Sequence, residues 1–383
     1  MASYNSIFSV VVALLATTFF CSSSANSSVS SVAVEQEAKA LLQAGWWTHD
    51  SLNTSNPSPC NFSGITCNRF GSITRISLLH NSKVPKKLGR FLNSSSFPNL
   101  VHLDLAEARL VGSIPSEIGT LSKLTHLNLA NNDLTGDLPL SLGNLSQLVR
   151  LDISYNRIKG SIPPQLGNLS NLVVLNLCSN QINGRIPSTL SLLFNLTHLD
   201  ISYNQIHGSI PSDIGKLKNL VSLSLSVKKL YGPLPSTLGQ LTKLTYLSFY
   251  NNQMNCSIPS QIWNLTKLTY LDLGSNIFTG QLPPALGQLT NLSTLYLDSN
   301  QFSRSIPSEI GKLVHLQTLW LSSNMFTGPL PSTLFHLTNL NDLSLSSNQL
   351  NGSIPSEIGK LVNLQYLVIF NISLDHCLQH CFI

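Results

Sequence analysis

The chain has 383 residues, of which only 10% are charged, well below the ~25% that is typical of soluble proteins. Its length could hold two or three ordinary domains. The formal net charge of +5 is thinly spread, and the one tight basic group consists of Lys86, Lys87 and Arg90. Nucleic-acid binding needs Lys and Arg clustered on one face, so this composition excludes it. A surface rich in Ser, Thr and Asn instead suits an extracellular setting.

Residues 1–25 have the pattern of a secretory signal peptide. An apolar run extends from Ile7 to Phe20, and Ser23 and Ala25 satisfy the small-x-small rule, which places cleavage after Ala25. The run is shorter than the ~20 apolar residues of a membrane span, which is the alternative interpretation, and no run of 18 or more apolar residues occurs further along the chain. We therefore expect a secreted protein of the apoplast or cell wall. If the chain is part of a longer receptor, we expect it on the outer face of the plasma membrane.

Six of the seven cysteines remain after this cleavage. Cys60 and Cys67 bound the segment Cys-Asn-Phe-Ser-Gly-Ile-Thr-Cys, which is short enough for a loop disulfide in an oxidising compartment. The alternative is two free thiols. We expect Cys178 and Cys256 to be free, because they lie three repeats apart in the pattern described next.

The dominant feature of the chain is a 24-residue repeat. Eleven full repeats span residues 100–363, a divergent repeat at 71–99 precedes them, and a broken repeat with an atypical tail at 364–383 follows. The first leucines of the full repeats are Leu100, Leu124, Leu148, Leu172, Leu196, Leu220, Leu244, Leu268, Leu292, Leu316 and Leu340. A fixed period of this length with L-x-x-L-x-L-x-x-N is the signature of leucine-rich repeats.

Each position of the repeat has a physical role. The second and third leucines are two residues apart, so they share one face of a short strand, and stacked neighbours bury that face. The Asn eight residues after the first Leu can bond the backbones of adjacent turns; Ala108 and Lys228 replace it, so the Asn ladder should be weaker there. Gly permits a bend, Pro sets φ, and Leu-Gly-x-Leu packs the convex side as short 3₁₀ or helical turns. We predict an α/β solenoid, a horseshoe with a parallel β-sheet on its concave face.

Two motifs resemble plant leucine-rich-repeat receptor-like kinases. The Gly-x-Ile-Pro segment, as in Gly112 to Pro115, resembles the plant-specific repeat. Residues 26–70, with Glu37 to Leu42, two tryptophans and the cysteine loop, resemble the N-terminal cap of those ectodomains, although Phe62 stands where the family usually has Trp. The resemblance implies a right-handed superhelix, a cell-surface location, a peptide or protein ligand and a leucine-rich-repeat kinase as co-receptor.

The resemblance stops at the ectodomain, because the chain has no kinase Gly-rich loop, His-Arg-Asp or Asp-Phe-Gly motif. The tail lacks the capping segment and the wider-spaced Cys pair with which such receptors close. We interpret it as a truncated or mis-spliced end. It carries four side chains of metal-ligand types, His376, Cys377, His380 and Cys381. Closed zinc sites draw ligands from two separated pairs, so we expect no metal and no cofactor, and the pairing of the two tail cysteines stays open.

Side chains two, four and six residues after each first Leu should face the concave surface. Toward the N-terminus these are His102, His126, Arg150 and His198, and toward the C-terminus they are Tyr246, Tyr250, Tyr270, Tyr296 and Trp320. Aromatic side chains in a rigid concave setting are typical anchors of interfaces, so we predict that these five bind the ligand. The alternative is an aromatic lining without a ligand. The Arg-x-Arg pair with which some peptide receptors of the family hold a carboxyl terminus is absent, which argues against that ligand class.

Four aspartates, Asp104, Asp152, Asp200 and Asp272, occupy the fourth position after a first Leu. Stacked carboxylates could suggest a paired acid and base, but hydrolysis requires two of them to converge on one bond. These are mostly two repeats apart, and Leu-Asp-Leu is ordinary filling of the repeat. We therefore predict that the protein is not an enzyme.

We predict glycosylation at eleven Asn-x-Ser/Thr acceptor sequences: Asn53, Asn61, Asn93, Asn144, Asn168, Asn195, Asn255, Asn264, Asn291, Asn351 and Asn371. Within the regular repeats each falls in the turn, on the convex side or in the link to the next strand. Glycans there would leave the concave face open.

The sequence favours an extracellular ligand-recognition protein of the receptor type. The alternative is a secreted enzyme inhibitor similar to the polygalacturonase-inhibiting proteins, which share this repeat. Those carry cysteine caps at both ends, so the missing C-terminal cap argues against it.

Overall fold

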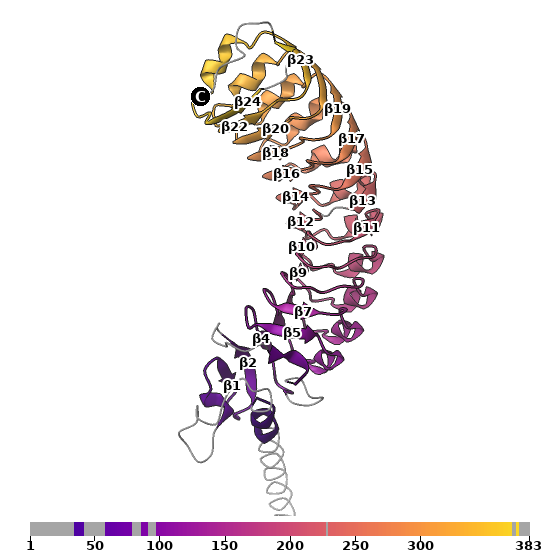
Figure 1. Ribbon diagram of the computed structural model, residues 1–383, viewed down its shortest axis with the longest axis vertical. Helices are drawn as coiled ribbons and strands as arrows, with labels where there is room; N and C mark the ends of the chain where they lie inside the picture. The colour runs from indigo at the N-terminus through magenta and orange to yellow at the C-terminus, as the bar shows by residue number, and fades with distance from the viewer. Residues whose placement is uncertain are drawn as a thin grey trace, which may run out of the picture.

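The computed structural model describes residues 34–41, 58–78, 86–90, 97–226, 229–369 and 373–374. They form a curved solenoid with a long sheet along the inner side of the curve and short 3₁₀ turns along the outer side (Figure 1). The predicted fold class is therefore confirmed.

The concave sheet has fourteen strands. In spatial order they are β1 (Ile65–Cys67), β2 (Ile73–Ser77), β4 (His102–Asp104), β6 (His126–Asn128), β8 (Arg150–Asp152), β9 (Val174–Asn176), β10 (His198–Asp200), β12 (Ser222–Ser224), β14 (Tyr246–Ser248), β16 (Tyr270–Asp272), β18 (Thr294–Tyr296), β20 (Thr318–Trp320), β22 (Asp342–Ser344) and β24 (Tyr366–Val368). β1 and β2 pair antiparallel, whereas the later neighbours are parallel. From β4 onward the register is constant, so that Leu247, for example, lies beside Leu271.

Two smaller parallel sheets flank the concave sheet, and we did not predict them from the sequence. One contains β3 (Lys86–Lys87), β5 (Leu110–Ser113) and β7 (Asp133–Thr135). The other contains β11 (His207–Gly208), β13 (Lys229–Gly232), β15 (Gln253–Cys256), β17 (Ile277–Gly280), β19 (Gln301–Arg304), β21 (Met325–Gly328), β23 (Gln349–Gly352) and β25 (Ser373–Leu374). Where the repeat has Gly at the bend, the backbone is left-handed, as at Gly280 with φ of 89°. That bend turns the chain from this flank toward the convex side.

The convex side consists of 3₁₀ turns, as predicted. They are η4 (Ser116–Thr120), η5 (Leu140–Asn144), η6 (Pro164–Asn168), η7 (Ser188–Leu192), η8 (Ser212–Lys216), η9 (Ser236–Gln240), η10 (Ser260–Asn264), η11 (Pro284–Gln288), η12 (Ser308–Lys312), η13 (Ser332–His336) and η14 (Ser356–Lys360), with η2 (Pro59–Asn61) and η3 (Leu88–Arg90) before them. A proline stands immediately before each of η4 to η14, such as Pro235 before η9. Its fixed φ and missing N–H suit the start of such a turn.

A ladder of buried Asn amides runs along the strand ends. The Asn252 side chain donates to Leu225 O at 2.9 Å and to Phe249 O at 3.0 Å, and its Oδ1 accepts from Leu230 N at 3.1 Å. These bonds join adjacent turns, as predicted. Ala108 adds no amide to the ladder, and Lys228 lies outside the described residues; the weakening expected at these two positions stays a prediction.

Two aromatic residues act as wedges between convex turns. A Cβ added to Gly287, in the Leu-Gly-x-Leu segment, would lie 2.8 Å from Glu309 O of the next turn, so glycine allows close stacking. Trp263 and Phe335 occupy this same position and are both 1% exposed. Adjacent convex turns pack most closely across Gly, less closely across Ser191 and least closely across the two aromatic wedges.

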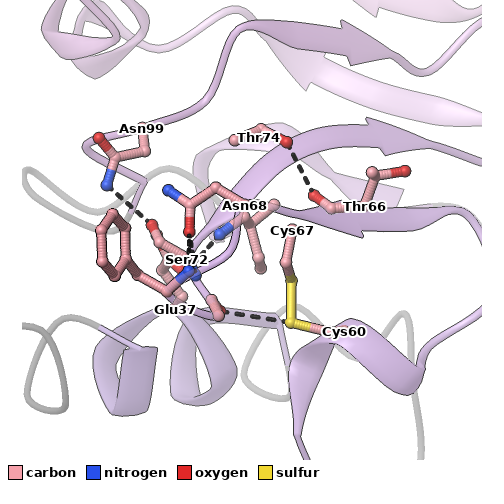
Figure 2. Close-up of a disulfide and its surroundings, with 11 residues drawn as sticks. Glu37, Cys60, Thr66, Cys67, Asn68, Ser72, Thr74 and Asn99 are labelled. Atoms are coloured by element: carbon pink, nitrogen blue, oxygen red, sulfur yellow. Dashed lines mark hydrogen bonds between the residues drawn. A yellow bond between two sulfur atoms is a disulfide. The ribbon is translucent and has the colours of Figure 1, made fainter.

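The N-terminal cap is anchored by a buried carboxylate. Residues 34–41 are helical, and Glu37 accepts from Ser72 Oγ at 2.6 Å and from Ile73 N at 2.8 Å (Figure 2). The predicted Cys60–Cys67 disulfide is present, with Cα atoms 5.7 Å apart. Cys178 and Cys256 are free, as expected.

We expect Cys256→Gly to stabilise the protein by about 0.5–1 kcal/mol. Cys256 stands at the bend where nine other repeats have Gly, yet its φ is 67°, a conformation that strains an L-residue. Its side chain is exposed, so little packing is lost. Chemical denaturation would measure the change.

The matched control is Gly280→Ala, at the same bend one repeat later. The added Cβ would have room, since the nearest atom is Ser257 Cβ at 3.5 Å, so only the left-handed φ is penalised. A loss of about 1 kcal/mol is expected. If neither substitution changes stability in its stated direction, strain at this bend is not significant.

Candidate functional site

Four of the five predicted ligand-binding residues form a continuous row on the concave face. The Tyr246 and Tyr270 rings stack at a centroid distance of 4.4 Å and an interplanar angle of 10°. Tyr270 meets Tyr296 edge to face at 5.8 Å, and Tyr296 meets Trp320 at 4.7 Å. These four residues, on β14, β16, β18 and β20, are called the aromatic ladder below.

Strand register explains the aromatic ladder. Tyr246 and Tyr270 are direct neighbours in the parallel pairing, and so are Tyr296 and Trp320. The step from Tyr270 to Tyr296 is diagonal, between positions two and four of adjacent repeats, which is within reach of aromatic side chains.

Tyr250 stands apart from the aromatic ladder. It is 39% exposed, and no ring contact joins it to the other four within the described part of the chain. Trp320, at the other end of the row, is 37% exposed, whereas the three ladder tyrosines are half-buried. The structure thus assembles Tyr246, Tyr270, Tyr296 and Trp320 into one surface and leaves Tyr250 beside it.

Asp272 lies directly beneath the aromatic ladder. Its Oδ1 accepts from Gly274 N at 3.0 Å, and its Oδ2 accepts from Tyr270 OH at 3.3 Å and from Ser248 Oγ at 3.4 Å. The side chain is buried, and burial raises the pKa of this carboxyl to about 6; neighbouring Asp298 also raises it. The aromatic ladder therefore contacts a buried carboxyl group, that of Asp272.

Two further carboxylates belong to this region. Asp298 and Asp272 both face Gly274, where an added Cβ would lie 2.8 and 3.3 Å from their Oδ1 atoms. Burial raises the pKa of Asp298, and it raises that of the Tyr296 phenol, which the charges of Asp272, Asp342 and Asp298 raise further. Asp298 and Asp342 were not among the predicted site residues, because they occupy positions six and two of their repeats and lie outside the aspartate column at position four.

Within the described residues, these three carboxylates have no cationic partner. None of the described Lys, Arg or His side chains forms an ion pair with Asp272, Asp298 or Asp342, whereas Asp152, Asp133 and Asp213 pair with Arg150, Arg157 and Lys216. The strand segments 245–251, 269–275, 293–299, 317–323 and 341–347 contain three Asp and no Lys, Arg or His. The surface around the aromatic ladder is therefore acidic and uncompensated.

The N-terminal part of the concave face differs from it. The His102 and His126 rings lie 5.1 Å apart, and burial lowers the pKa of His102, as do the positive charges of Arg75 and His126. Arg150 pairs with Asp152 at 3.1 Å. Here His and Arg side chains lie on the same face as the aspartates, so this part of the face carries charges of both signs.

The column of aspartates at position four has a structural role. Asp104, Asp152, Asp200 and Asp272 each accept a hydrogen bond from the backbone N–H two residues later. Such side-chain turns fix the strand end. That the protein is not an enzyme stays a prediction.

The structure describes only some of the predicted glycosylation sites and none of the tail residues of metal-ligand types. Eight of the eleven predicted glycosylation sites are described and all eight are exposed, whereas Asn53, Asn93 and Asn371 lie outside the described residues. Their occupancy stays a prediction. The described residues contain no group of three metal-ligating side chains, and His376, Cys377, His380 and Cys381 lie outside them. No described helix is both long and apolar enough to span a membrane.

The in-register sheet, the convex turns and the Asn ladder define a leucine-rich-repeat solenoid. A family profile described as "Leucine-rich repeat region" matches residues 174–304 and 285–381, and one described as "Leucine Rich Repeat" matches 123–145 and 147–169. The chain belongs to the leucine-rich-repeat family.

The chain is similar to plant receptor ectodomains, as the sequence motifs indicated. The LRR receptor-like serine/threonine-protein kinase GSO2 of Arabidopsis thaliana is 36% identical over 72 residues, which are 18% of this chain and 5% of that protein. The PEPR1–AtPEP1 structure has a TM-score of 0.79 at 34% identity and covers 87% of this chain and 46% of its own. The LRR ectodomain of the Arabidopsis receptor kinase HAESA, in complex with an N-terminally extended IDA peptide hormone ligand, has a TM-score of 0.73 at 30% identity over 89% of this chain and 62% of its own. The chain thus spans about half the length of these solved relatives.

We expect Asp272→Asn to stabilise the protein at pH 7 but not at pH 4. The pKa of this carboxyl is about 6 when folded, against an ordinary 3.8, so folding favours the protonated form. The stability from this preference is fully present below pH ~4 and is lost as the pH rises to ~6, by about 3 kcal/mol at most. Asparagine removes the charge and keeps an acceptor for Gly274 N–H. Chemical denaturation at the two pH values measures the difference.

Asp152→Asn is the matched control. Asp152 occupies the same position of its repeat and is 6% exposed, as is Asp272, but its carboxylate is paired with Arg150. Neutralising it removes an attraction, so no gain at pH 7 is expected. Equal gains for both variants, or an Asp272→Asn effect that does not depend on pH, would contradict the account.

Proposed function

We propose that this chain is an extracellular, non-enzymatic recognition protein that binds an extended peptide, or an extended segment of a protein, along its concave face across the aromatic ladder. The observation that carries the proposal is the aromatic ladder itself, four contacting rings on consecutive strands of a rigid sheet. Aromatic side chains supply most of the binding energy in many interfaces, because they bury a large area at little cost in conformational entropy.

Two further observations support this function. The HAESA ectodomain, which shares the fold at 30% identity, is in complex with a peptide hormone ligand. The eight described glycosylation acceptors all lie outside the strands of the concave sheet, so glycans on them would leave the ladder accessible. The secretory signal, glycan occupancy and a leucine-rich-repeat kinase as co-receptor belong to the same proposal.

We expect the double variant Tyr296→Ala/Trp320→Ala to lose peptide binding without unfolding. A display library of random twelve-residue peptides, selected on the purified full chain, provides the probes. Removing two adjacent anchors should raise the dissociation constant of the selected peptides at least about tenfold. Calorimetry measures binding, and circular dichroism checks the fold.

The control is Phe194→Ala/Tyr231→Ala. These side chains are 55% and 47% exposed, and they lie on the link after η7 and on β13, outside the concave sheet. Binding should be unchanged in this variant. Selected peptides that bind the ladder variant as tightly as the unmodified chain would overturn the proposed site.

A further inference from the structure

The charge around the aromatic ladder restricts the chemistry of its ligand. Three carboxylates interact electrostatically with Tyr296. Asp272 lies at the end of β16, Asp298 lies two residues after Tyr296, and Asp342 lies at the start of β22. None of them has a cationic partner within the described chain, unlike Asp152 with Arg150. Partly buried charges interact more strongly than exposed ones, because solvent screens them less.

The composition of the face strengthens this selectivity. The basic residues close in sequence to these strand segments include Lys243, Lys267, Arg304 and His315, and all four lie outside the strands of the concave sheet. Burial raises the pKa of Tyr246 and of Tyr296, so these phenols are neutral donors at physiological pH. An acidic ligand would meet uncompensated repulsion, whereas a basic ligand would supply the missing counter-charges.

We propose that the ligand of the aromatic ladder is a basic peptide segment, whose Lys or Arg side chains lie over Tyr296 and Trp320 and pair with Asp298 and Asp342. This inference rests on the proposed function and adds the sign of the ligand's charge. Aromatic faces and carboxylates act together here. The aliphatic stem of Lys or Arg packs on a ring, the ring face attracts the cation, and the carboxylate accepts its hydrogen bonds.

The experiment compares three pools of fluorescein-labelled, twelve-residue random peptides, fixed at net charges of +3, 0 and −3, for binding to the purified full chain. We expect the +3 pool to bind at least about tenfold more tightly than the neutral pool and the −3 pool to bind least. Asp298→Asn/Asp342→Asn should remove most of this preference, because it eliminates two of the three unpaired charges.

A matched variant separates local from overall charge. Glu117→Gln/Glu309→Gln removes the same two negative charges from the convex turns η4 and η12 and should leave the preference intact. If both double variants reduce binding of the +3 pool equally, attraction to the whole molecule explains the preference and the inference is wrong.

The remaining outcomes distinguish this inference from the proposed function. If the ladder variant Tyr296→Ala/Trp320→Ala weakens binding but the neutral or −3 pool binds best, the ligand is not basic and only the inference fails. If the ladder variant binds every pool as the unmodified chain does, the proposed function fails, and the inference with it.

Discussion

The backbone hydrogen bonds between parallel strands are the constraint on which the rest of the structure depends. Phe249 N, for example, donates to Asp272 O at 2.8 Å, and the same bond recurs from Leu273 N to Tyr296 O at 2.9 Å. Because each residue is held beside the one 24 positions later, a side chain repeated at one position becomes a row with the strand spacing of about 4.8 Å. The aromatic ladder is such a row, and so is the Asn ladder that stabilises it.

With the strand spacing fixed on the inside, the side chains on the outside determine the curvature. Gly allows adjacent convex turns to approach, whereas Trp263 and Phe335 separate them. Widening the outer spacing at a constant inner spacing rotates one repeat against the next and closes the concave face. The two wedges lie in the repeats of β14 and β20, the first and last strands of the aromatic ladder. The residues that shape this surface thus include two buried ones on the opposite side of the molecule.

The sequence was sufficient for features that recur with the repeat. The strands, the convex turns, the Asn ladder and the row from Tyr246 to Trp320 all follow from one residue's position within its 24-residue unit. The flanking sheets could not be predicted from the sequence, because they depend on backbone hydrogen bonds with no matching hydrophobic pattern. The cluster of carboxylates at the aromatic ladder could not be predicted either. Asp272, Asp298 and Asp342 occupy different positions of their repeats, so only the stacked strands bring them around Tyr296.

Asp272 shows that local stability does not account for this surface. The equivalent position holds Ser in the preceding repeat, at Ser248, and in the repeat after the ladder, at Ser344. An uncharged side chain there would avoid the desolvation that raises the pKa of Asp272. Asp152 meets the same burial with an adjacent guanidinium, whereas Asp272 has only hydroxyl and amide donors. A folded chain that retains such a charge keeps a negative potential where the aromatic rings are exposed. Charges that are costly to folding and unpaired within a protein are typical of surfaces whose counter-charge comes from a ligand.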